Sequence, residues 1–371
     1  MQIFVPKECD KETRVSVTPD TVKKFVKLGV SVQIEAGAGL KSLFSDKDYE
    51  LAGGKIIPSE DRVTALRNAD LILHVLPISV EDIKQLKPQA WHISFFDAFR
   101  FSEELEQFKV QKTNVISLER IPRTSFAQKM DALSSQSSLA GYVAVIQGVS
   151  HLLKTLPMMV TPAGTLQAAR VFVVGAGVAG LQAIATAKRL GARVEAFDTR
   201  PEVEEQVNSL GAKFVKMDLG KTESTQQGYA KALTEEQLQK QRELMVETCA
   251  HSDIVITTAK VFGRKAPIII NKAMLDAMKP GSVVVDLAVE AGGNTEGLVP
   301  GCNAKTSNGI AILGEGYWER KVATSASSML ANNLFALIND LWNPETQTLK
   351  ADESDKILSG CWWIKDGQPR F

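Results

Sequence analysis

The sequence has few of the features that mark nucleic-acid-binding, secreted or membrane-spanning chains. Lys+Arg and Asp+Glu each number 43 in 371 residues, so no basic excess exists to replace counterions on a nucleic acid. No uncharged apolar run reaches the roughly 18 residues of a bilayer-spanning helix. The N-terminus is charged within ten residues and lacks the apolar segment of a signal peptide. We expect a cytoplasmic chain that reaches a membrane only through a partner.

Cysteine is also scarce. The four cysteines lie far apart, form no CxxC pair, and are Cys9, Cys249, Cys302 and Cys361. Scattered thiols of this kind are typical of reduced cytosolic proteins and do not match a disulfide framework or a zinc site. We therefore expect no metal centre.

What is present is a repeated alternation of short apolar strands with amphipathic stretches, which predicts βαβ units and parallel sheets. The candidate strands in the first 120 residues are 3–5, 32–35, 71–75, 92–95 and 115–118. A second series follows at 171–174, 193–197, 213–215, 254–257, 282–286 and about 310–313, with a strand-like tail at 358–364. A chain of 371 residues is too long for one ordinary core and suggests two domains.

Two long helical patterns, at about 128–154 and 326–341, bracket the second series of strands. The chain is therefore expected to leave its first domain, build a second, and return. The prediction is an α/β protein with two Rossmann-like, doubly wound domains separated by a cleft. The discontinuous N-terminal domain would comprise residues 1–127 plus 325–371, and the nucleotide-binding domain with its linking helix residues 128–324.

The sharpest local motif is GxGxxG at Gly175, Gly177 and Gly180, which follows the candidate strand 171–174 and opens a helical pattern. The first glycine permits a tight strand-to-helix turn, the second lets a pyrophosphate approach the backbone, and the third lets helix and strand pack closely. The helix N-terminus would supply N–H donors and a partial positive charge. A turn without a ligand is the alternative.

The next strand ends in Asp198, eighteen residues after Gly180. A carboxylate at this position accepts hydrogen bonds from the adenosine ribose and repels a 2′-phosphate, which favours NAD(H). Arg200, two residues further on, could instead hold that phosphate, so NADP(H) stays open as the weaker alternative.

Several segments resemble the alanine dehydrogenase and transhydrogenase superfamily. They are PKE at 6–8, TRVSVTPDTVKKFVKLG at 13–29, EAGAG at 35–39, GAGVAGLQAIATAKRLGA at 175–192, DIVITTA at 253–259 and MKPGSVVVDLAVEAGGN at 278–294. Two more, IPRTSFAQKMDALSSQSSLAGY at 121–142 and FDTRPEVEEQV at 197–207, resemble proton-translocating NAD(P) transhydrogenases in particular, in their soluble NAD(H)-binding alpha subunits.

The resemblance implies roles for individual residues. Arg123, Gln128, Asp131 and Ser134 match a loop on the nicotinamide side, and such groups supply the donors and acceptors that a carboxamide needs. The alternative is that Asp131 and Ser134 only cap the long helix that begins here. Phe126 stands where we would expect an arginine, so its role is open.

The resemblance also implies further cofactor contacts. The expected set around the glycine motif and beyond it is Ala176, Val178, Ala179, Thr199, Gln241, Ala259 and Lys260. Gly228 and Tyr229, with Ala230 and Lys231, match a mobile loop that closes over bound nucleotide; an ordinary solvated loop is the alternative. The chain departs from the family at Lys260 and at 314–327, where we would expect an apolar stretch and a proline-bearing loop.

The proton-handling residues of alanine dehydrogenases are not found at their expected places. Leu76 stands at the place of the lysine, Phe96 or Asp97 near that of the histidine, and Glu290 at that of the aspartate. Arg14, which could bind a substrate carboxylate, is present, and a shift of register could bring His74 or His92 into the cleft. Each histidine is more simply interpreted as a core or surface residue.

Direct hydride transfer between two nicotinamides needs no acid or base. The resemblance therefore implies NAD(H) on this chain and NADP(H) on a partner chain, with proton-translocating membrane subunits and a homodimer formed through the segment 156–170. The chain would be peripheral to the inner membrane. Two alternatives stay open: an NAD-dependent amino acid dehydrogenase of the alanine type, and a non-catalytic NAD(H)-binding module.

Overall fold

The structure is a computed structural model that describes residues 1–96, 103–216, 234–260 and 265–370. The chain divides into two compact units, residues Met1–Gln136 with Arg320–Phe371, and residues Ser137–Glu319. The first unit is discontinuous in sequence. Residues 128–136 and 320–324, which were predicted to belong to the second domain, fall in the first unit.

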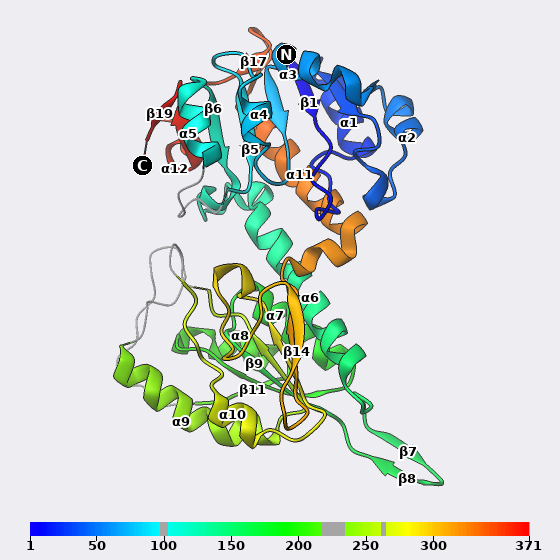
Figure 1. Ribbon diagram of the computed structural model, residues 1–371, viewed down its shortest axis with the longest axis vertical. Helices are drawn as coiled ribbons and strands as arrows, with labels where there is room; N and C mark the ends of the chain where they lie inside the picture. Colours follow the sequence, from blue (N-terminus) through cyan, green and yellow to red (C-terminus); the bar gives the residue numbers. More distant parts are fainter. Residues whose placement is uncertain (97–102, 217–233, 261–264, 371) are drawn as a thin grey trace. The chain divides into compact units, whose positions relative to one another are not determined.

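The first unit is built on a parallel sheet with an antiparallel extension at one edge (Figure 1). The strand order is β19-β18-β6-β5-β4-β1-β2-β3. The parallel strands are β1 (Gln2–Val5), β2 (Ser31–Glu35), β3 (Lys55–Ile57), β4 (Leu71–Leu73), β5 (Trp91–Ser94) and β6 (Asn114–Ser117). β18 (Trp362–Lys365) pairs antiparallel with β6, and β19 (Gln368–Pro369) pairs with β18.

Helices cover both faces of this sheet, and the central strands β4, β5 and β6 are buried along their whole length. The connecting helices are α1 (Pro19–Lys27), α2 (Asp46–Leu51), α3 (Arg62–Asn68), α4 (Val80–Ile83) and α5 (Glu103–Val110). The long α11 (Ala323–Leu341) buries Leu330, Leu334 and Leu337 completely in one core cluster. The returning C-terminal helix thus completes the N-terminal domain.

The second unit holds a seven-stranded sheet in the order β11-β10-β9-β12-β13-β15-β14. Its strands are β9 (Arg170–Val174), β10 (Arg193–Phe197), β11 (Lys213–Phe214), β12 (Ile254–Thr257), β13 (Val283–Asp286), β14 (Cys302–Lys305) and β15 (Ala311–Gly314). All pairs are parallel except β14–β15. The helices are α6 (Ala132–His151, shared with the first unit), α7 (Val178–Arg189), α8 (Glu204–Ser209), α9 (Glu235–His251) and α10 (Lys272–Ala277). The predicted α/β class with two Rossmann-like halves is confirmed.

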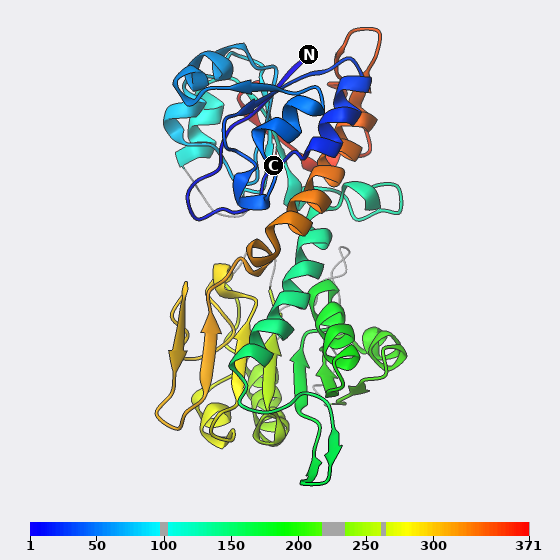
Figure 2. The same cartoon turned by 90° about the vertical axis from the view of Figure 1, so that its right-hand side faces the viewer.

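A two-stranded hairpin, β7 (Met159–Thr161) and β8 (Gly164–Leu166), extends from the second unit (Figure 2). It follows the break that the sequence marked at 156–170. The tail strand expected at 358–364 is partly wrong, because residues Leu358–Cys361 form the short helix α12 before β18 begins. Among the described residues, no helix is both long and apolar enough to span a bilayer.

Candidate functional site

The glycine motif lies at the point where the strand order of the second sheet reverses. The chain runs from β9 outward to β10 and β11 and then returns to place β12 on the other side of β9. Val174 at the end of β9 is in register with Phe197 of β10 and Thr257 of β12. The β9–α7 turn therefore lies at a topological switch point, and open α/β sheets bind their ligands at such points, outside the carboxyl ends of the strands.

Two of the three glycines are required by the fold itself. Gly175 has φ +100°, and a Cβ on it would lie 2.3 Å from Thr258 Oγ1. A Cβ on Gly180 would lie 1.8 Å from the carbonyl oxygen of Gly175, so helix α7 packs directly on the turn. The Thr258 hydroxyl donates to the carbonyls of Val174 and Gly175 at 3.2 and 3.1 Å, which fixes the end of β9 against β12.

Gly177 has a different environment from its two neighbours. It is the N-cap of α7 with an ordinary φ of −79°, no side-chain cap forms there, and no atom lies within 4 Å of a Cβ built on it. The first turn of α7 carries the backbone N–H groups of Val178, Ala179 and Gly180. No capping side chain at Gly177 accepts a hydrogen bond from them. A helix N-terminus of this kind attracts a phosphate.

Asp198 lies directly after β10 and ties that strand to the glycine turn. Its Oδ2 accepts from the Ala176 N–H at 2.7 Å, and its Oδ1 accepts from the Arg200 N–H at 2.9 Å. The Arg200 guanidinium adds two bonds to the same carboxylate, at 3.0 and 2.9 Å. Thr199 between them is half-buried. Asp198, expected to favour NAD(H), and Arg200, which could instead hold a 2′-phosphate, thus form one ion pair.

The ends of β12 and β13 are joined by a polar network. Asn294 bonds both the N–H and the carbonyl of Ala259, at 3.1 and 2.8 Å. Asp286, fully buried, accepts from Ala288 N–H, Asn294 N–H and the Thr295 hydroxyl at 2.6–2.9 Å. Burial raises the pKa of Asp286 despite these bonds. This carboxylate was not predicted as a site residue, although it ends the VVVD strand within a segment that resembles the family.

Lys260 and Glu290 form an ion pair of 2.7 Å at the same edge of the sheet. Glu290 also accepts from the Tyr317 N–H at 2.5 Å. Burial by itself would raise the pKa of Glu290, but the Lys260 charge and both hydrogen bonds hold it below its ordinary value. The two departures from the family, at Lys260 and at 314–327, therefore meet at one carboxylate. Glu290 is kept ionised at neutral pH, and an ionised carboxylate cannot act as a general acid.

The remaining candidates of this unit are less well supported. Gln241, on α9, is 3 % exposed, and its amide contacts the sulfur of Met245 at 3.5 Å, so it faces the interior. Gly228, Tyr229, Ala230 and Lys231 lie outside the described residues.

In the first unit, the loop 121–131 leads into α6. Asp131 accepts from the Ser134 N–H at 2.9 Å and from its hydroxyl at 2.6 Å, so these two side chains cap the helix. Arg123, Phe126 and Gln128 are exposed on the same loop. In the structure Asp131 and Ser134 therefore bond each other and cap the helix, which is the alternative given for them above. The side chains of Arg123 and Gln128 are exposed.

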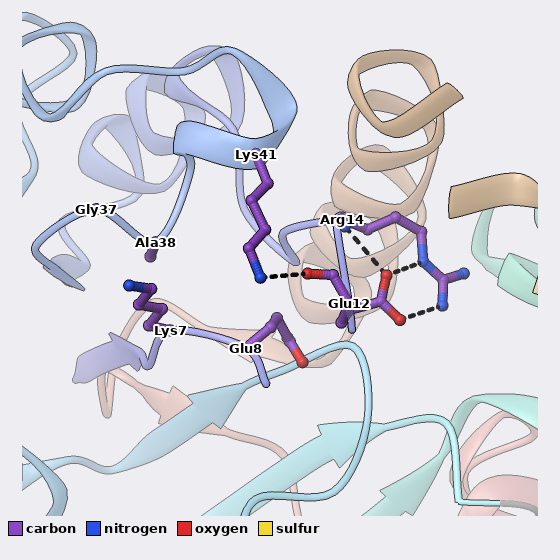
Figure 3. Close-up of a pocket in the computed structure, with 7 residues that line it drawn as sticks. All are labelled: Lys7, Glu8, Glu12, Arg14, Gly37, Ala38 and Lys41. Carbon is purple, nitrogen blue, oxygen red and sulfur yellow. Dashed lines mark hydrogen bonds and ion pairs between the residues drawn. The ribbon is translucent and has the colours of Figure 1, made fainter. Parts of the chain in front are cut away.

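Arg14 lies in a buried network close to a cavity of about 10 Å³ (Figure 3). Its Nε and Nη2 bond the two oxygens of Glu12 at 2.8 Å each, and its Nη1 bonds Gln136 at 3.0 Å. Arg320 contacts the same Glu12 carboxylate at 2.8 Å. The bidentate face that would bind a substrate carboxylate is taken by Glu12, and the cavity has room for only about one water.

The two histidines of this unit are core residues. His92 is fully buried, bonds Ser94 Oγ at 3.1 Å, and packs on Phe108 with ring centroids 4.9 Å apart. His74 Nδ1 lies 2.5 Å from the Leu76 carbonyl and 3.1 Å from Glu8 Oε2. Burial lowers the pKa of His74 to about 4 and that of His92 well below its ordinary value. Both rings are neutral at physiological pH. Of the other two positions, Phe96 is buried and Asp97 lies outside the described residues.

Comparisons with known proteins agree along the whole chain. Residues 4–140 match the model of the alanine dehydrogenase/PNT N-terminal domain, and residues 144–370 match that of the C-terminal domain. A relative from Rhodospirillum rubrum, named as the first part of an NAD(P) transhydrogenase subunit alpha, is 42% identical, covering 99% of this chain and 97% of its own length. NAD(P) transhydrogenase subunit alpha of Haemophilus influenzae is 39% identical, covering 99% of this chain and 71% of its own length.

Solved structures give the same grouping. A transhydrogenase from Sinorhizobium meliloti superimposes with a TM-score of 0.88 at 41% identity, over 100% of both chains. An L-alanine dehydrogenase gives a TM-score of 0.82 at 24% identity, over 100% of this chain and 97% of its own, and shows the shared fold. The chain therefore belongs to the alanine dehydrogenase/PNT family, and its relatives that are about 40% identical include proteins named as NAD(P) transhydrogenase alpha subunits.

Proposed function

We propose that this chain is the NAD(H)-binding subunit of a proton-translocating NAD(P) transhydrogenase, from which hydride passes directly to NADP⁺ on a partner subunit. Relatives named as alpha subunits support the existence of partners. The uncapped α7 N-terminus and the open space at Gly177 support dinucleotide binding. The partner subunits would include the membrane-embedded ones, so this chain would lie at the cytoplasmic face of the inner membrane.

One observation carries the proposal. In the described part of the chain, the side chains that an amino acid dehydrogenase could use are already paired with other residues or buried. Glu12 holds Arg14, Lys260 and the Tyr317 N–H hold Glu290, and the imidazoles of His74 and His92 are buried. Oxidising an amino acid moves protons together with a hydride. Transfer between two nicotinamides requires only that the rings are positioned and that water is excluded.

Each unit contributes its own part to this role. The first turn of α7 would bind the pyrophosphate, and Asp198 with Thr199 and Arg200 would hold the adenosine ribose. Arg123 and Gln128 would contact the nicotinamide side, while Asp131 and Ser134 hold their loop by capping α6. Bound NADH supplies the hydride. Contacts by Gly228, Tyr229, Gln241, Ala259 and Lys260 stay predictions.

The reaction can be tested with the purified chain in two parallel assays. In the first, NADH and the NADP(H)-binding chain of the same organism, loaded with NADP⁺, are added, and we expect NADPH to form. In the second, NADH, pyruvate and ammonium are added without a partner, and we expect no NADH oxidation. Brisk amination of pyruvate would instead establish an amino acid dehydrogenase. NADH binding with no activity in either assay would indicate a non-catalytic module.

Asp198→Ala tests the proposed preference for NAD(H). Removing charge-assisted hydrogen bonds to the ribose should weaken NADH binding about 10- to 100-fold. NADPH binding should weaken less or improve, because the carboxylate that repels a 2′-phosphate is gone. Both affinities are measured by titrating nucleotide fluorescence. Equal affinities in the variant and the wild type would refute the role of Asp198.

We also propose a homodimer formed through the hairpin β7–β8. An isolated two-stranded hairpin is only marginally stable in water, yet this one exposes Met158, Val160 and Leu166 by 57, 72 and 50%. A second copy of the chain would cover these side chains. Replacing residues 158–166 with two glycines leaves the Ala169 N–H bond to Leu156 at the hairpin base. We expect the solution mass to halve, and a persistent dimer would contradict the proposal.

A further inference from the structure

Phe126 is the most exposed aromatic side chain among the residues that the structure describes. It exposes 63% of its surface, whereas Tyr142 and Tyr317 follow at 41 and 39%. Its neighbours along the chain, Ile121, Ala127 and Met130, are at most 5% exposed. The ring therefore projects from a loop in which Ile121, Ala127 and Met130 face the core.

The loop that carries Phe126 is held in place by its own backbone. The Thr124 N–H bonds the Pro122 carbonyl at 3.0 Å, the Ala127 N–H bonds Thr124 at 3.0 Å, and the Met130 N–H bonds Ala127 at 2.8 Å. The amide of Asn333, on α11, donates to the Lys129 carbonyl at 2.9 Å. Because the turn is fixed on both sides of Phe126, little conformational entropy is lost when the ring enters a complementary surface.

We propose that Phe126 docks into an apolar recess on the NADP(H)-binding partner chain, and that Lys129 faces a carboxylate at the rim of that recess. This inference rests on the function proposed above. Lys129 is exposed on the same loop as the ring. Aromatic anchors with a charged rim are typical of protein interfaces.

The geometry of hydride transfer indicates that the surface around Phe126 contacts the NADP(H)-binding partner chain. The two nicotinamides must come within about 3–3.5 Å of each other. The partner surface around its own nicotinamide must therefore reach the surface around Gln128, which is the proposed nicotinamide contact on this chain. Phe126 is two residues from Gln128, so their Cα atoms are at most about 7 Å apart. An interface of ordinary size covers roughly 800 Å² on each partner, and a residue so close to its centre lies within it.

The test compares Phe126→Ala and Phe126→Trp with the control Leu51→Ala, which removes another exposed apolar side chain, 75% exposed on α2 of the same unit. Three quantities are measured for each full-length chain: the Kd for NADH, the Kd for the NADP⁺-loaded partner chain by calorimetry, and the thermal midpoint. For Phe126→Ala we expect the partner Kd to rise about 30-fold, as for a truncated aromatic anchor. Its NADH Kd and thermal midpoint should not change.

Phe126→Trp should keep most of the partner affinity because it preserves an aromatic anchor, and Leu51→Ala should match the wild type. An unchanged partner Kd in Phe126→Ala, while the wild type transfers hydride, would overturn the inference and leave the proposed function intact. A weaker NADH Kd with unchanged partner binding would assign the ring to the nucleotide instead. A wild-type chain that neither binds the partner nor transfers hydride would refute both.

Discussion

Gly177→Ala is expected to weaken NADH binding roughly 100-fold, or by about 2.7 kcal/mol, with almost no change in the thermal midpoint. In the protein alone there is room for the added methyl group, because no atom lies within 4 Å of it and φ is −79°. Replacing an N-cap glycine with alanine lowers stability by no more than about 1 kcal/mol. The methyl group would, however, occupy the space through which a pyrophosphate approaches the N–H groups of α7.

Gly180→Ala is the matched control, since it adds the same methyl group one turn further along. Here the new Cβ would lie 1.8 Å from the Gly175 carbonyl oxygen, so the packing of α7 on β9 must change. The free energy of unfolding should fall by about 2–4 kcal/mol. Denaturant titrations and fluorescence titrations with NADH separate the two effects. If Gly177→Ala binds NADH as the wild type does, the turn is not the pyrophosphate site.

Arg14→Met is expected to lower the free energy of unfolding by about 3 kcal/mol, because it leaves the buried Glu12 carboxylate short of its main partner. Arg320 still contacts Glu12 at 2.8 Å, which keeps the loss at the lower end of the usual range. Urea unfolding measures this loss. The double variant Glu12→Gln/Arg14→Met should recover part of it, since the uncompensated charge is gone.

The pH dependence of this loss has a defined sign. Burial would raise the pKa of Glu12, but hydrogen bonds and charge from Arg14, with the charge of Arg320, lower it below its ordinary value of 4.5. The ion pair therefore contributes fully above pH 4.5 and its contribution is lost as the pH falls through the folded-state pKa. The difference between the wild type and Arg14→Met should shrink below pH 4.5. A difference that grows on acidification would contradict the assignment of Glu12 as the ionised partner.

The central strands were predictable because parallel strands covered on both faces are mostly apolar. β1, β5, β9 and β12 each begin within one residue of the predicted position. β3 and β14 were missed because they are edge strands with little buried apolar surface: only Ile57 of β3 and no residue of β14 is buried. The helix α12 was mistaken for strand because four apolar or small residues show no periodicity that separates the two structures.

The glycine turn was predictable for the same local reason, since strand, turn and helix are consecutive in sequence. Contacts between distant segments were not predictable. The Lys260–Glu290–Tyr317 cluster joins residues up to 57 positions apart, and nothing in the sequence pairs them. Arg14 and Glu12 are only two residues apart in sequence, yet their ion pair was not predictable either. A single sequence does not show whether an arginine binds a neighbouring residue or a ligand.

The most direct test of direct hydride transfer uses NADH with deuterium at both C4 positions, mixed with the chain and its NADP⁺-loaded partner in ordinary water. The mass of the NADPH formed is measured after a single turnover. Direct transfer predicts NADPH that carries one deuterium at C4. NADPH that carries only protium from solvent, or a partner left fully as NADP⁺ while NADH stays bound, would contradict it.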